Sequence, residues 1–269
     1  MKRTLSLPVW IALALGVLGA VLQQFHRLTC YDEKGYVIAG RPLTGFLIGA
    51  AAAIVILSVA TGAWYAVRTR LPEGQAPVPP RPAGAAVRTC RVLAALLLVA
   101  FSVWQFVTAE DRGALQLAVC LAGLASAFCL LALGLSAGRN AGSAGHAFQA
   151  AFPGLFYCLL LVLHFIGNVS NPALLSFCMG CLAFAADSLF LFSMGAAWVE
   201  ERQSFSVACF GLAAAGLSLL AMTAPQITPA DRTALAAAVL VAASHLLAIG
   251  IRPAAGDPEA PAPDGPADP

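Results

Sequence analysis

Long apolar runs alternate with short polar segments along almost the whole chain. A helix that crosses a bilayer core needs about 20 apolar residues, with a range of about 17–25. The runs lack a period-two alternation of apolar and polar positions, so they predict helices rather than the strands of a membrane barrel. Eight such spans are expected, at residues 5–25, 43–67, 92–107, 114–135, 148–167, 173–199, 205–223 and 232–251. The third is the shortest and the sixth the longest of these.

The polar segments between the runs predict loops. A turn at Tyr31–Tyr36 is flanked by residues that favour strands and indicates a short hairpin. The segment 68–91 carries five prolines and is typical of an extended loop. Residues 1–251 are therefore expected to form a single transmembrane helical domain, and the Pro/Asp-rich residues 252–269 a disordered tail.

The distribution of lysine and arginine predicts the orientation of this bundle. With the N-terminus in the cytoplasm and eight spans, ten of the fifteen basic residues fall on the cytoplasmic side. Five of those ten lie in the segment after the second span: Arg68, Arg70, Arg81, Arg88 and Arg91. We expect both termini in the cytoplasm. Seven spans, with the tail outside, are the alternative, because the third run is short.

Composition supports the same class of protein. Hydrophobic residues make up 60% of the 269 residues, charged residues make up 10%, and the mean hydropathy is +0.83. A soluble domain has about 25% charged residues, so an ordinary soluble enzyme, a disordered chain and a nucleic-acid binder are excluded. The expected partner is the lipid bilayer. Thirteen of the fifteen basic residues are arginine, a bias typical of GC-rich genomes, so we expect a bacterial cytoplasmic membrane.

Asp187 is the centrally placed carboxylate within the predicted spans. It lies fourteen residues beyond Ala173, which is about 21 Å along the helix axis. A central Asp costs about 2.5–3.5 kcal/mol on insertion scales, so it should face protein or water. It shares one face of the sixth span with small or polar residues: Ser176, Gly180 and Ala183. Two roles stay open, a hydrogen bond that holds helices together or a site for an ion, a proton or a small solute.

Two histidines are candidate partners for a site in the membrane. His245 lies at nearly the depth of Asp187 in the eighth span and could form a proton-carrying pair with it. His164 shares a polar face of the fifth span with Tyr157 and Asn168, close to the end of that span. This second set fits either a polar edge at the membrane interface or part of a binding site.

Cys178 and Cys181 form a CxxC motif near the start of the sixth span. On a helix the two sulfurs are neighbours, close to the positive end of the helix dipole. This spacing allows a thiol-redox or soft-metal site, although the eight cysteines fall mostly in apolar runs, where they are typical small core residues. No phosphate-binding loop, zinc-protease motif or nucleophile elbow is present, so no cofactor or metal is expected.

Three local features resemble uncharacterised multi-spanning membrane proteins of gut Firmicutes. They are the Tyr31-Asp32-Glu33-Lys34-Gly35 segment after the first span, the Asn171-Pro172 turn before the sixth span, and an alanine-rich last helix with a short tail. The resemblance implies the topology and carries no assigned activity. The chain is expected to be a non-enzymatic structural, sensory or accessory component, with a small-solute or proton-coupled transporter and a membrane thiol redox protein as the alternatives.

Overall fold

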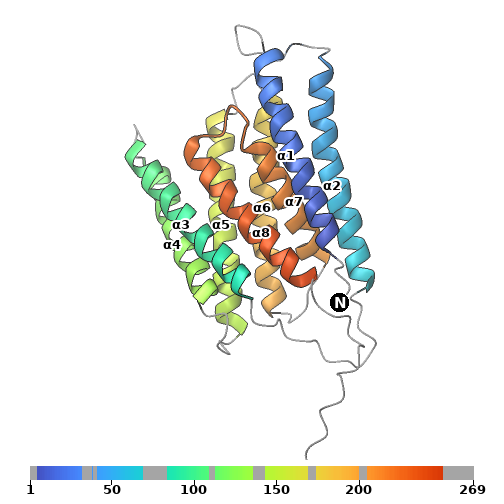
Figure 1. Cartoon of the computed structure of the whole chain (residues 1–269). Coiled ribbons are helices and arrows are strands. Elements are labelled where there is room, and N and C mark those ends of the chain that lie inside the picture. Colours follow the sequence, from blue (N-terminus) through green and yellow to red (C-terminus); the bar gives the residue numbers. More distant parts are fainter. Residues whose placement is uncertain are drawn as a thin grey trace, which may run out of the picture.

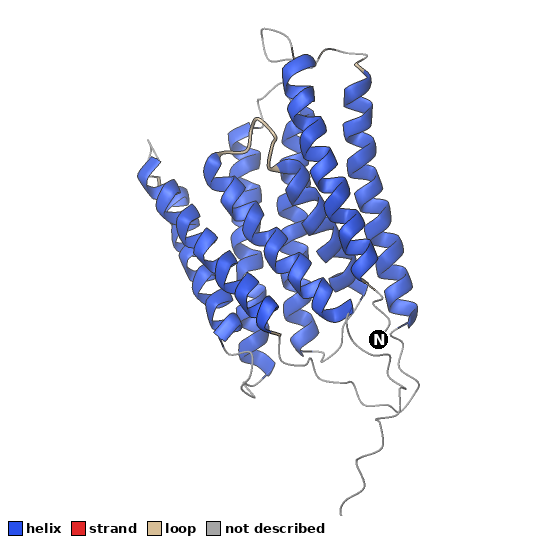
Figure 2. Cartoon of the chain, viewed as in Figure 1, coloured by secondary structure: helices blue, strands red, loops and turns tan. Residues whose placement is uncertain are grey.

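The structure, a computed structural model, describes residues 5–31, 38, 41–68, 84–108, 113–135, 143–168, 174–199 and 205–250. Helices account for almost all of these residues, and the longest described connection is the loop between the last two helices (Figure 2). The helices of the described residues are α1 (Ser6–Thr29), α2 (Pro42–Arg68), α3 (Ala85–Thr108), α4 (Ala114–Leu135), α5 (Ser143–Asn168), α6 (Leu174–Val199), α7 (Phe205–Ala221) and α8 (Pro229–Gly250). The predicted all-α class is confirmed.

Successive helices run in opposite directions (Figure 1). The odd-numbered helices begin, and the even-numbered helices end, at the end of the bundle where the chain starts. Helices α3 to α8 form a closed ring, because each packs on the next and α3 also packs on α8. Helices α1 and α2 lie beside the ring and pack on α7. As a result α7 touches four other helices and is buried along most of its length.

Glycines allow the backbones around α7 to approach closely. A Cβ atom added to Gly16 of α1 would lie 2.7 Å from the carbonyl oxygen of Gly216 on α7. A Cβ atom added to Gly62 of α2 would lie 2.8 Å from the Cβ of Cys209, also on α7. Small residues at helix crossings are typical of membrane bundles, where van der Waals packing drives association.

Seven of the described helices are long and apolar enough to cross a membrane, which makes this a multi-pass membrane protein. Large apolar side chains cover the outside of the bundle, among them Trp10, Phe46, Ile56 and Phe128, as expected where the solvent is lipid. The eighth apolar helix, α7, has 17 residues and is therefore about 25 Å long.

The sequence prediction was wrong about which helix is shortest. The third helix begins at Ala85 rather than at residue 92 and has 24 residues. Its first two turns carry Arg88 and Arg91, which a hydropathy argument leaves out although both have high helix propensity. The short helix is α7 instead, with 17 residues, and the longest is α2, with 27 residues, rather than α6, with 26.

Three expected features lie at least partly outside the described residues. These are most of the hairpin at 31–36, the proline-rich segment at 69–83 and the tail at 252–269. Next to the predicted hairpin, the Ile38 amide donates a hydrogen bond to the Cys30 carbonyl at 2.8 Å.

Candidate functional site

Asp187 lies at the middle of α6 and is completely buried. The Ser218 hydroxyl of α7 lies 2.8 Å from its Oδ1 and 3.0 Å from its Oδ2, and donates to the carboxylate. Ser218 is itself fully buried. The two side chains therefore form a polar joint between α6 and α7 at a point where the surroundings are apolar.

The next residue of α6 forms a second joint, to α5. The Ser188 hydroxyl donates to the Gly154 carbonyl at 2.9 Å and also lies 2.9 Å from the Cys158 sulfur. Gly154 follows Pro153, which stands inside α5 and has no amide hydrogen to donate to the preceding turn. Consecutive residues of α6 thus connect it to the helices on both sides.

Tyr157 connects α5 to α8 across the ring. Its hydroxyl donates to the Ala234 carbonyl at 2.6 Å, and its side chain is 1% exposed. Beside it, the rings of Phe101 and Phe156 meet edge to face at 5.2 Å and fill the interior of the ring. The sequence placed Tyr157 on one face of its helix with His164, and the structure adds its hydrogen bond to α8.

His245 lies on α8, which touches α6, the helix of Asp187. Its ring lies 6.0 Å from the ring of Phe190 in this contact. Both residues are buried. The expected pairing of Asp187 with His245 stays a prediction.

A second polar cluster lies at the end of the bundle where α5 ends and α6 begins. The His164 ring meets Phe184 edge to face at 5.6 Å and fits against Gly180, where an added Cβ would lie 2.5 Å from its Nε2 atom. Asp231, in the first turn of α8, is buried at this end of the bundle too. We call His164 and Asp231 the end pair. Asn168 is the last residue of α5, and its side chain lies outside the described residues.

Asp231 is held by the start of its own helix. Its carboxylate accepts hydrogen bonds from the Thr228 hydroxyl at 2.8 Å and from the Thr228 amide at 3.3 Å. In return, the Asp231 amide donates to the Thr228 hydroxyl at 3.1 Å. This reciprocal arrangement is a capping box. The Thr-x-x-Asp spacing is visible in the sequence and would have drawn attention to Asp231, which the sequence analysis did not single out.

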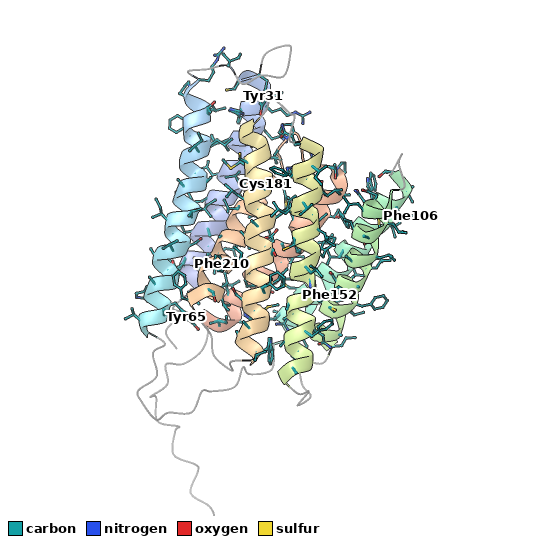
Figure 3. The ribbon with its side chains drawn as sticks, turned by 180° about the vertical axis from the view of Figure 1, so that it is seen from behind. Tyr31, Tyr65, Phe106, Phe152, Cys181 and Phe210 are labelled. Atoms are coloured by element: carbon teal, nitrogen blue, oxygen red, sulfur yellow. The ribbon has the colours of Figure 1, made fainter. Side chains whose placement is uncertain are left out.

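The CxxC motif lies in the same half of the bundle as the end pair. Figure 3 labels Cys181 in the part of α6 nearer to Tyr31, far from Tyr65. Cys178 and Cys181 are half-buried free thiols. Within the described ranges, no three His, Cys, Asp or Glu side chains converge as a set of metal ligands. The redox hypothesis therefore rests on the spacing of the two cysteines alone.

No protein-family model, curated protein or solved structure matches the chain.

Proposed function

We propose that this protein is a non-enzymatic structural, sensory or accessory component of a bacterial cytoplasmic membrane. In this proposal all eight helices cross the bilayer, both termini are cytoplasmic, and Asp187 is a joint between helices. The related membrane proteins are then the uncharacterised Firmicutes families that the local motifs resemble. The observation that carries the proposal is the complete burial of Asp187 against Ser218.

This observation favours a structural role for a physical reason. A carboxyl group in the membrane interior is costly unless a neighbour satisfies it. Both Asp187 oxygens meet the Ser218 hydroxyl, and the helices next to it pack with glycines against backbone atoms. A side chain arranged in this way stabilises a helix contact without needing any ligand.

A thermal unfolding screen tests this proposal. Purified wild type and the Asp187→Asn variant are heated with a panel of amino acids, sugars, organic acids and nucleosides, each at several pH values. We expect the Asp187→Asn substitution to lower the unfolding temperature by the same amount under every condition. A solute that stabilises the wild type and not the variant would contradict the structural role. Ser218→Ala is the matched control, because it alters the same joint from α7 without changing the acid.

A small-solute or proton-coupled transporter is the second candidate. It is favoured by the placement of titratable groups at two levels of three helices, α5, α6 and α8. The end pair lies near one end of the bundle, and Tyr157 and Asp187 are buried closer to its middle. Ionisable residues inside membrane spans often mark proton or substrate paths. Pro153 also interrupts the hydrogen bonding of α5, a feature found in transporter helices.

Reconstituted vesicles distinguish this candidate from the first. A pH-sensitive dye inside the vesicles reports proton movement when the same panel of solutes is added outside. Transport predicts a signal in wild type that Asp187→Asn abolishes and His164→Gln reduces. No signal with any solute, together with uniform destabilisation of the variants, supports the structural role.

A further inference from the structure

A basic groove lies where α3 begins and α4 ends. It is a cavity of about 270 Å³ lined by Arg88, Thr89, Val92 and Leu93 of α3 and by Gly134 and Leu135 of α4. This is the end of the bundle where the chain starts (Figure 1). Gly134 packs against α3 here, where an added Cβ would make ordinary contacts of 3.4 Å with the Cβ of Arg91 and 3.5 Å with the Arg88 carbonyl.

A second arginine lies directly beside the groove. Arg91 is 3% exposed, although it stands near the end of a helix. One of its terminal nitrogens donates to the Leu133 carbonyl at 3.3 Å, and its Nε has no hydrogen-bond partner among the described residues. A buried guanidinium with one long hydrogen bond leaves most of its positive charge without compensation. It therefore adds to the positive potential that Arg88 places at the groove.

The remaining walls of the groove suit an acyl chain. Leu93 is 46% exposed and Leu135 is 71% exposed, so both face the surroundings of the bundle rather than its core. In a membrane protein those surroundings are lipid. The groove thus combines a cationic end with an apolar side that opens to the bilayer.

We propose that this groove binds an anionic phospholipid, with its phosphate group at Arg88, beside the buried charge of Arg91, and an acyl chain along Leu93 and Leu135. Basic pockets between transmembrane helices bind anionic head groups for this electrostatic reason. The site is independent of Asp187 and holds for either function considered above.

A lipid titration tests the site. Purified protein in detergent is titrated with a phosphatidylglycerol, with a phosphatidylcholine of the same chains, and with inorganic phosphate, and the unfolding temperature is recorded as a measure of binding. We expect phosphatidylglycerol to stabilise the wild type most strongly. Arg88→Gln should lower the affinity for phosphatidylglycerol about five-fold, since one basic residue contributes about that factor to binding at a membrane surface.

Two comparisons make the outcome decisive. Arg88 is exposed, so its replacement should leave the fold intact, and Arg27→Gln at the other end of the bundle is the matched control. The site is overturned if Arg88→Gln and Arg27→Gln respond to phosphatidylglycerol as the wild type does. The lipid assignment is overturned if inorganic phosphate, or the phosphatidylcholine, stabilises the protein as much as phosphatidylglycerol.

Discussion

Ser218 and Asp187 show how a single polar contact acts inside an apolar bundle. The Ser218 hydroxyl donates to both oxygens of the Asp187 carboxylate, and neither side chain is exposed. In water such a contact would compete with solvent, but in the bundle the alternative is an unsatisfied polar group. Measured interhelical hydrogen bonds in membranes nonetheless average about 0.6 kcal/mol, with a maximum of about 1.7 kcal/mol.

We therefore predict a measurable but modest coupling between these two residues. In a double-mutant cycle, Asp187→Leu and Ser218→Ala should be non-additive by about 0.5–1.5 kcal/mol in the free energy of unfolding. The free energies come from denaturant unfolding in mixed micelles. Strict additivity would mean that the hydrogen bond contributes nothing to the α6–α7 contact.

Ser126 provides the control for this cycle. It is fully buried in α4, and its hydroxyl has no hydrogen-bond partner among the described residues. Ser126→Ala removes a polar group that gains nothing from its surroundings, so stability should stay the same or rise slightly. A loss comparable to that of Ser218→Ala would show that the cycle reports packing rather than hydrogen bonding.

The sequence revealed one half of this joint and not the other. Asp187 stands out because a carboxylate in an apolar span is rare and costly. Ser218 does not, because α7 is buried on nearly all sides and its sequence therefore indicates no preferred face. His245 matches Asp187 in depth, but depth does not determine which way a side chain points around its helix, so this pairing stays a prediction.

At the scale of helices, the packing of α7 depends on particular glycines rather than on glycine content. Gly16 meets the backbone of α7, whereas Gly49 of α2 has no atom within 4 Å of an added Cβ. The sequence places both in apolar helices and cannot distinguish them, because the difference arises only when α1 and α7 come together.

Alanine substitutions at these two glycines should have opposite effects. Gly16→Ala should destabilise the protein by about 1–3 kcal/mol, because α1 must move away from α7. Gly49→Ala should be neutral or should stabilise it by up to about 1 kcal/mol, because alanine favours the helix. Thermal unfolding of the two variants side by side measures the difference. Equal effects would contradict the α1–α7 contact.

The start of α8 depends on its capping box. Thr228→Val keeps the shape of the side chain but removes the hydroxyl that bonds the Asp231 amide and carboxylate. We expect a loss of about 1 kcal/mol in the free energy of unfolding. Thr233→Val is the control, because the Thr233 hydroxyl bonds the Ala230 carbonyl of its own helix. An equal loss in the free energy of unfolding for both variants would show that the capping box does not stabilise the start of α8.

At the scale of the whole molecule, every inference about Asp187 depends on α6 and α7 lying in the membrane together. Composition was enough to predict a helical membrane protein, since so few charged residues cannot cover a soluble globule of this size. The number of crossings is harder to predict, because α7 is shorter than the other helices and its neighbours supply much of its apolar environment. The alternation of helix directions in Figure 1 favours a crossing by each helix.

The location of the C-terminus tests this most directly. A reporter that is active only in the cytoplasm, and one that is active only outside, are each fused after Pro269 of the full chain and expressed in cells. Eight crossings from a cytoplasmic N-terminus predict activity of the cytoplasmic reporter alone. Activity of the external reporter alone would contradict a cytoplasmic C-terminus, and with it the topology of eight crossings from a cytoplasmic N-terminus in which Asp187 is placed.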